Sequence, residues 1–333
     1  MTLRLIEFIL PQSASQAMPE WRGEDDILGR WEERLEADLV LVRVLVRAEQ
    51  AEATLDDLEM RFQGVAEFRT IVLPVEATLP RPPDVTNENG EKKKSPERIS
   101  REELYNDVVQ SATITRVFIA QTFLATLVAA VGLVRNETAV LIGAMVIAPL
   151  LGPNVSLCLA TTLGDFKLAL RSLRTNVIGL LVALATSLFI GFLFSIDAEG
   201  PAIQSRTLVS GGDIILALAA GCAGVLAFTT GAPSSLIGVM VAVALLPPFA
   251  VFGLLLANGE YQAASGALLL VATNVICVNL AGVLTFVVQG LRPRTWWEAR
   301  RATRATWGAV ATWACLLLVL VGLMFLAHRS TSP

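Results

Sequence analysis

The chain has 333 residues, of which 54% are hydrophobic, and a formal net charge of only −4. Its mean hydropathy of +0.60 is too high for a single soluble domain. One histidine and four scattered cysteines give a zinc or redox-metal site little to build on, so we expect no metal and no other cofactor. The sequence also lacks the paired-carboxylate, Ser-His-Asp, HExxH and P-loop patterns, and we predict that the protein is not an enzyme.

Residues 1–79 carry the pattern of a small soluble domain. Strands are predicted over 3–10, 39–46 and 68–75, and helices over 25–35 and 51–62. The second helix has Ala51, Leu55, Leu58 and Phe62 on one face. The order is β-α-β-α-β, and if the middle strand is split into a hairpin, the domain becomes a ferredoxin-like α+β sandwich.

A polar linker, rich in proline and lysine, follows over residues 80–99 and buries too little apolar surface to fold alone. The next helix is predicted over 100–114 and opens with a capping box of Ser100 and Glu103. Its apolar face consists of Leu104, Tyr105, Val108, Val109 and Ala112. Two placements fit this pattern equally well, flat on the cytoplasmic membrane surface or packed against the soluble domain. We expect this helix to run on into the first membrane span.

Seven apolar stretches follow, each near or above the ~20 residues that a helix needs to cross ~30 Å of hydrocarbon. They cover 117–134, 138–163, 177–196, 214–231, 235–258, 267–289 and 308–327. We expect no cleavable signal peptide before them, so the first span itself would direct insertion. Basic residues cluster before span 1 and in the loops between spans 2 and 3 and spans 6 and 7. The positive-inside rule therefore places the N-terminus in the cytoplasm and the C-terminus outside.

Two of the spans have similar sequences. Leu141–Pro153 recurs about 95 residues later as Leu236–Pro248, and Thr175–Ile178 is echoed by Thr273–Ile276. Spans 1–3 and 4–6 thus form two units, 115–196 and 213–290. An odd number of crossings in each unit makes the second unit inverted relative to the first, an architecture typical of secondary transporters.

Residues 291–333 lie beyond the repeat and supply a basic interfacial segment and a final transmembrane helix. Tryptophans interleave with arginines there, which fits the lipid headgroup region and argues against nucleic acid as a partner. Small residues over Ala219–Gly224 in span 4 allow close helix contact, either inside the bundle or between subunits. We expect a homo-oligomer.

Each copy of the repeated span carries prolines near its middle, Pro149 and Pro153 in the first and Pro247 and Pro248 in the second. Proline lacks an N–H donor and clashes with the preceding turn, so we expect both helices to be broken. Beyond each break a half-helix would present unpaired N–H groups and the positive end of its dipole. The pattern predicts a site for an anion or small polar solute between the two breaks. The alternative is a pair of proline kinks without a ligand.

The predicted substrate-binding residues are Pro149, Gly152, Pro153, Asn154, Ser156, Asn176, Pro247, Pro248 and Asn274. Asn176 and Asn274 match in the Thr-Asn-Val-Ile echo and could instead hold helices together. The spans carry no charged side chain or histidine away from their ends. That argues against a proton pump and against acid–base chemistry inside the bilayer.

Four segments carry a resemblance to a known family: Phe68–Glu76, Ser100–Tyr105, Leu141–Pro153 and Val243–Pro248. Over nearly its whole length the chain resembles the prokaryotic "uncharacterised hydrophobic domain" membrane proteins, a family of unknown function. The resemblance implies a prokaryotic inner-membrane protein with a cytosolic N-terminal domain. It brings no substrate and no catalytic residue.

Together these features predict a secondary transporter or channel-like carrier for a small polar or anionic solute, with the soluble domain as a regulator or oligomerisation unit. The alternative is a membrane-anchored sensor or scaffold whose cytosolic domain binds a ligand or partner. A polar, hydrated space between the two breaks would favour transport, and a dry, tightly packed crossing would favour the scaffold.

Overall fold

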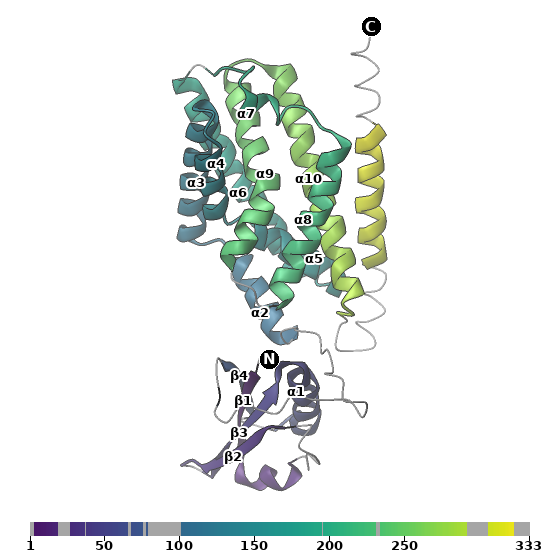
Figure 1. Cartoon of the computed structure of the whole chain (residues 1–333). Helices are drawn as coiled ribbons and strands as arrows, with labels where there is room; N and C mark the ends of the chain where they lie inside the picture. Colours follow the sequence, from purple (N-terminus) through teal and green to yellow (C-terminus); the bar gives the residue numbers. More distant parts are fainter. Residues whose placement is uncertain are drawn as a thin grey trace. The chain divides into compact units, whose positions relative to one another are not determined.

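The computed structural model is drawn in Figure 1 and describes residues 3–18, 27–36, 38–65, 68–75, 78, 101–194, 196–230, 234–291 and 306–322. The chain divides into two compact units, Met1–Tyr105 and Asn106–Pro333. The predicted linker over 80–99 lies outside the described residues. Each unit is described in turn below.

The first unit is a four-stranded antiparallel sheet with one long helix. Its elements are β1 (Leu3–Pro11), the 3-10 helix η1 (Gln12–Ala17), β2 (Gly29–Arg34), β3 (Leu39–Arg47), α1 (Ala48–Phe62) and β4 (Arg69–Val75). The strands lie in the order β2-β3-β1-β4, and each neighbouring pair is antiparallel. The small α+β domain predicted from the sequence is confirmed at this level.

One face of the sheet packs against α1, and the alternation along the strands explains which one. Ile6 and Phe8 of β1 and Val42 of β3 are fully buried, whereas their neighbours along each strand are only partly covered. Side chains on a strand point alternately to opposite faces, so every second residue meets the helix. The apolar stripe predicted for the helix is buried against them, with Leu58 and Phe62 each 1% exposed.

The helix predicted over 25–35 is wrong, because the described part of this segment contains the edge strand β2. Trp31 pairs with Arg43 of β3, and Arg43 donates to the carboxylates of Glu7 (2.8 Å) and Glu33 (3.0 Å). These hydrogen bonds raise the pKa of Arg43. The apolar residues that suggested a helix recur every four positions, and four is also a multiple of the strand period of two. The pattern therefore fits one face of a strand equally well.

The second unit is a bundle of apolar helices. Its elements are α2 (Arg101–Ser111, shared with the first unit), α3 (Arg116–Val134), α4 (Thr138–Ile147), α5 (Leu151–Leu163), α6 (Phe166–Leu193), α7 (Pro201–Gln204), α8 (Gly211–Thr230), α9 (Ser234–Ala257), α10 (Tyr261–Val288) and the helix Thr306–Gly322. Among the described residues four helices are long and apolar enough to cross a membrane, and the number is five if the bent pair α4 and α5 counts as one span. These are the helices of a polytopic membrane protein.

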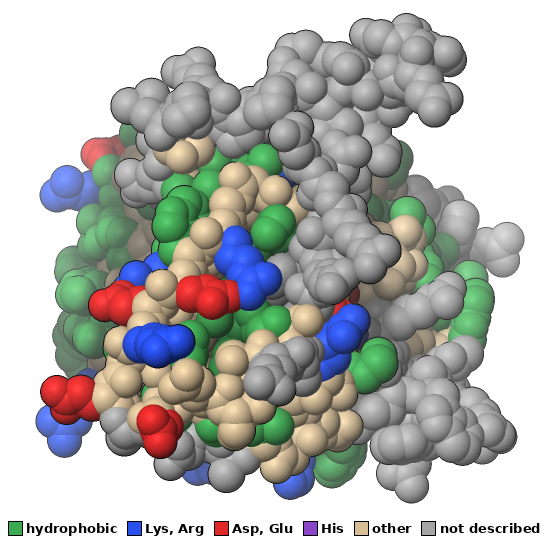
Figure 2. All heavy atoms as spheres, turned by 90° about the horizontal axis from the view of Figure 1, so that it is seen from below, with side chains coloured by type: hydrophobic (Ala, Val, Ile, Leu, Met, Phe, Trp, Pro, Cys, Tyr) green, Lys and Arg blue, Asp and Glu red, His purple; other side chains and the backbone are tan. Residues whose placement is uncertain are grey.

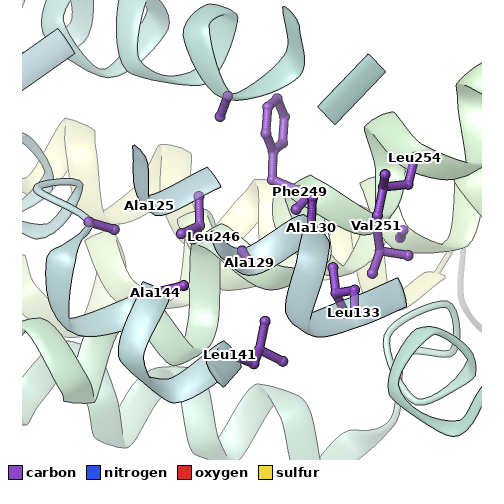
Figure 3. Packing of buried hydrophobic residues seen from close by; sticks show 14 of the residues in the cluster. Ala125, Ala129, Ala130, Leu133, Leu141, Ala144, Leu246, Phe249, Val251 and Leu254 are labelled. Atoms are coloured by element: carbon purple, nitrogen blue, oxygen red, sulfur yellow. The ribbon is translucent and has the colours of Figure 1, made fainter. Parts of the chain in front are cut away.

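The core of the bundle is built from small side chains that allow the helices to approach closely (Figure 3). Ala125 and Ala129 of α3 and Ala144 of α4 are fully buried, and they pack in one cluster with Leu246 and Phe249 of α9. Close packing of small residues is a main source of attraction between helices in lipid, where burial of apolar surface contributes little. Within this cluster α9 packs against both α3 and α4.

The helix predicted over 100–114 does not run on into the first span. It ends at Ser111, and α3 begins at Arg116 after Thr115, whose hydroxyl accepts a hydrogen bond from the Phe118 N–H at 3.0 Å. A threonine that caps the next helix cannot also continue the previous one. Val108 and Ala112 are fully buried in the protein, which argues against a helix lying flat on the lipid.

Charged side chains of both signs lie next to one another on the face of the molecule shown in Figure 2. On the described part of that face, Lys and Arg do not gather into one broad patch.

Candidate functional site

The first predicted break is present. Residues 148–150 separate α4 from α5, and the two helices meet at 50°. Ala148 is extended, with φ −68° and ψ 120°, as expected for a residue that precedes a proline. Pro149 therefore ends α4. Pro153 lies in the first turn of α5, where a helical N–H has no intrahelical partner and a missing donor costs little.

The second predicted break is absent, because α9 is one helix from Ser234 to Ala257 with Pro247 and Pro248 inside it. The repeat itself explains the difference. A shift of 95 residues places Ala244 at the position of Pro149, so the second copy lacks the proline that ends α4. Both internal prolines are buried, and packed surroundings let membrane helices tolerate proline.

Two converging half-helix starts are therefore not found in this fold. Around the crossing of α4 and α9 lie Ala144, Met145, Leu246 and Phe249, all apolar and buried. Figure 3 labels Ala144, Leu246 and Phe249 among the clustered apolar side chains. The polar groups closest to the break lie instead on the α5 side of it.

A chain of buried asparagines begins in the first turns of α5. The side-chain amide of Asn154 donates to the Leu150 carbonyl at 2.8 Å and to Oδ1 of Asn176 on α6 at 3.1 Å. Its own Oδ1 accepts from Nδ2 of Asn279 on α10 at 3.4 Å. Asn154 is 4% exposed and Asn279 is fully buried. Asn154 thus bonds back to the start of its own helix and joins α5 to α6 and α10.

Hydroxyl and thiol groups extend this network along α5. The Cys158 thiol lies 3.4 Å from Oδ1 of Asn279, in hydrogen-bond reach for sulfur. The Ser172 hydroxyl of α6 donates to Ser156 at 2.7 Å, and both serines are fully buried. We call the set Asn154, Ser156, Cys158, Ser172, Asn176 and Asn279 the asparagine network. All its members are polar side chains without a formal charge, and the hydrogen bonds described above join them to other protein groups.

The end of α2 packs beside the first turn of α5 and explains one more predicted residue. A β-carbon on Gly152 would lie 2.6 Å from Cβ of Ser111, so only glycine fits there. Next to it, the Thr175 hydroxyl of α6 donates to the Ala112 carbonyl at 2.7 Å. Gly152 is therefore a contact point between helices, and its neighbours are protein atoms.

Asn176 and Asn274 lie at different distances from the starts of their helices, although their sequence segments match. The helices α6 and α10 begin at Phe166 and Tyr261, whose numbers differ by 95, whereas the two asparagines differ by 98. A shift of 95 pairs Asn274 with Gly179 instead. Asn274 is buried on α10, as Asn279 is.

Sequence reasoning found Asn154, Ser156 and Asn176 but missed Asn279, Ser172 and Cys158. A signal for Asn279 exists, because it is an amide in a span that is otherwise almost wholly apolar. In the part of the chain that the structure describes, no three His, Cys, Asp or Glu side chains lie close enough to hold a metal ion.

A bundle of apolar helices with one bent helix pair and a buried polar network, preceded by a small antiparallel sheet domain, defines a polytopic membrane protein. Residues 145–280 match the family described as Domain of unknown function (DUF389). The chain is also 35% identical over 321 residues to "Uncharacterized protein MJ0678" of Methanocaldococcus jannaschii, covering 96% of this chain and 98% of that protein. The chain belongs to this family, as its motifs predict, and the relative is archaeal. No solved structure matches the chain.

Proposed function

We propose that the protein is a carrier or channel-like transporter for a small polar or anionic solute, and that it performs no enzymatic reaction. The observation that carries the proposal is the asparagine network beside the break between α4 and α5. Polar side chains are expensive inside a membrane and usually mark a functional path. Broken helices are likewise tolerated at this depth only where protein or a polar cavity covers the freed backbone groups.

Helix positions and lengths of the kind expected for an inverted repeat support this proposal. The first helices of the two units, α3 and α8, begin at Arg116 and Gly211, whose numbers also differ by 95. They have 19 and 20 residues, and the last helices of the units, α6 and α10, have 28 each. With the bent pair counted as one span, each unit has three crossings, and an odd number inverts the second unit.

Contacts between the two repeats of the bundle, 115–196 and 213–290, are reciprocal, as a twofold relation requires. A β-carbon on Gly253 of α9 would lie 2.7 Å from Cβ of Ser187 on α6. A β-carbon on Gly282 of α10 would lie 2.7 Å from the sulfur of Cys158 on α5. Adding 95 to Ser187 gives Gly282, and subtracting 95 from Gly253 gives Cys158. The same small-residue crossing is thus made twice.

In this proposal the protein has seven spans, with α9 and the helix Thr306–Gly322 as the remaining two, and lies in a prokaryotic inner membrane. The loop charges predict a cytoplasmic N-terminus and an external C-terminus. The strand order β2-β3-β1-β4, with α1 joining β3 to β4, fits a ferredoxin-like domain in which η1 occupies the slot of the first helix. We assign this domain a regulatory or oligomerisation role.

A sensor or scaffold is the second candidate, and a specific observation favours it. The crossing of α4 and α9 is filled by apolar side chains, and the amide of Asn154 is fully engaged by protein groups. A network that serves only to hold helices together would look the same.

Solute-dependent thermal stabilisation of the purified full-length protein separates the two candidates. The screen covers small anions, amino acids and nucleotides, and each hit is retested on Asn154→Ala and Asn279→Ala. The matched control is Asn258→Ala, because Asn258 also donates to buried carbonyls, at 3.0 Å to Gly191 and to Leu254, at the far end of α9.

A transported solute should stabilise the wild type and Asn258→Ala but not the two network variants, and wild-type proteoliposomes should take it up. A hit that stabilises both network variants as strongly as the wild type would place binding elsewhere in the chain. Stabilisation without uptake would favour the sensor.

A further inference from the structure

The first turns of α6 carry a row of basic side chains that the proposed transport path does not use. Lys167, Arg171 and Arg174 are all exposed and lie at spacings of four and three residues, which puts them on one side of the helix. None of the three forms an ion pair with a carboxylate of the described residues. Asp165 beside them caps the helix by accepting from the Leu168 N–H at 3.0 Å.

Large apolar side chains are exposed on the same turns. Phe166 is 78% exposed, Leu170 57% and Leu173 50%, while Leu168 and Ser172 face the bundle. A soluble surface rarely combines three free cations with three exposed large apolar groups in nine residues. The combination fits the boundary of a lipid leaflet, where apolar side chains enter the acyl region and long basic ones reach the phosphates.

The length of α6 supports this placement. Its 28 residues span about 42 Å at 1.5 Å per residue, roughly 12 Å more than the hydrocarbon layer. At its other end Phe189, Phe192 and Leu193 are 63%, 74% and 61% exposed, as lipid-facing residues are. The surplus of about eight residues therefore falls on the first turns, where the basic row begins.

The repeat provides an internal comparison for the basic row. A shift of 95 residues pairs its members with Gln262, Gly266 and Leu269 of α10. In the second repeat, α10 is an equally long helix with no charge at these positions. Helix formation and packing therefore do not require the basic row.

We propose that Lys167, Arg171 and Arg174 form a binding site for the phosphate groups of anionic phospholipids in the leaflet at that end of the bundle. A free phosphate ion would use the cations alone, whereas a phospholipid also covers Phe166 and Leu170. The site is independent of any transported solute. Each basic residue at a membrane surface contributes about a fivefold increase in affinity for anionic lipid, so the row contributes on the order of a hundredfold.

The test uses the full-length protein in nanodiscs of phosphatidylcholine with and without phosphatidylglycerol, and measures the relative affinity for phosphatidylglycerol by native mass spectrometry or with spin-labelled lipid. The wild type should prefer phosphatidylglycerol, and the triple Gln variant of the basic row should lose most of that preference. Arg135→Gln, at the far end of α3, is the control that removes a charge elsewhere and should behave as the wild type does.

If the triple variant fails to insert, the single variants Arg171→Gln and Arg174→Gln serve instead, each with about a fivefold loss, and Arg171→Lys should retain the preference. An unchanged preference in the Gln variants would overturn the proposal. Inorganic phosphate that stabilises the lipid-free wild type, but not the triple variant, would also overturn it, because the site would then bind the free ion.

Discussion

Substituting Asn154 by alanine tests whether the asparagine network holds the bundle together. The change removes two donated hydrogen bonds, to Leu150 and Asn176, and one accepted from Asn279. Hydrogen bonds between membrane helices contribute about 0.6 kcal/mol each on average, which gives roughly 1 kcal/mol for the two that reach α6 and α10. The bond to Leu150 lies within α5 and is not counted. The Asn279 amide keeps its bond to the Val275 carbonyl at 2.8 Å, but its second N–H loses its partner, which adds about 1 kcal/mol. We expect Asn154→Ala to lower the free energy of unfolding by about 2 kcal/mol.

The assay is reversible unfolding of the purified protein in mixed micelles, and a double-mutant cycle sharpens it. Asn154→Ala and Asn279→Ala share a hydrogen bond, so their combined effect should fall short of the sum by at least ~0.5 kcal/mol. Strictly additive losses, or a loss below ~0.5 kcal/mol for Asn154→Ala alone, would refute the reasoning, because the network would then not couple α5 to α10.

Gly253→Ala should destabilise the protein by about 1–3 kcal/mol, because its new β-carbon would clash with Ser187 on α6. Gly143→Ala is the matched control in the same unfolding assay. Open space surrounds Gly143, so this change should stabilise α4 by up to ~1 kcal/mol. Ala244→Pro should cost about 3 kcal/mol or more and bend α9, which spin-label distances across the helix would report; no change in those distances would contradict our account of the break. In the soluble unit, Arg4→Ala should cost about 3 kcal/mol, since Arg4 is buried and pairs with Glu103 through two contacts of 2.8 and 3.1 Å. Chemical denaturation should show a smaller loss of stability for Arg43→Ala, because its partners Glu7 and Glu33 stay in contact with water. A reporter fused to the C-terminus should face the outside of the cell, and an internal signal would mean that one span is miscounted.

Features with a strong local cause were predicted from the sequence. The break at Pro149 follows from one missing donor and one steric clash, and the apolar stripe of α1 follows from its period. The strand β2 was missed because its apolar residues are spaced by a number that suits both a helix and a strand. The amide of Asn279 stands out in an apolar span, but its pairing with Asn154 could not be predicted, because the two residues are 125 positions apart and no local pattern links them.

The unbroken α9 shows how much the position of a proline matters. Pro149 and Pro248 lie in corresponding segments and both lack an N–H, yet only the first segment is broken. Burial does not separate the two segments, because Ala148 and Leu150 at the break are buried, as are residues 245–250 of α9. The difference is that α9 has Ala244 where the first segment has Pro149. A proline in a membrane span predicts a weakness, and its position in the segment decides whether the helix breaks.

That weakness has a mechanical consequence for α9. Because Pro247 and Pro248 have no N–H, the carbonyls of Val243 and Ala244 lack the donors that would normally stiffen this turn. Two of the hydrogen bonds that resist bending elsewhere in a helix are missing here before any bend occurs. The free-energy difference between a straight and a kinked α9 is therefore smaller than in a proline-free helix. The corresponding segment of the first repeat, α4 with α5, is already kinked. The two copies of one repeated sequence thus have different conformations in a single molecule. The free energy needed to bend α9 into the conformation of the other copy is lowest at this turn.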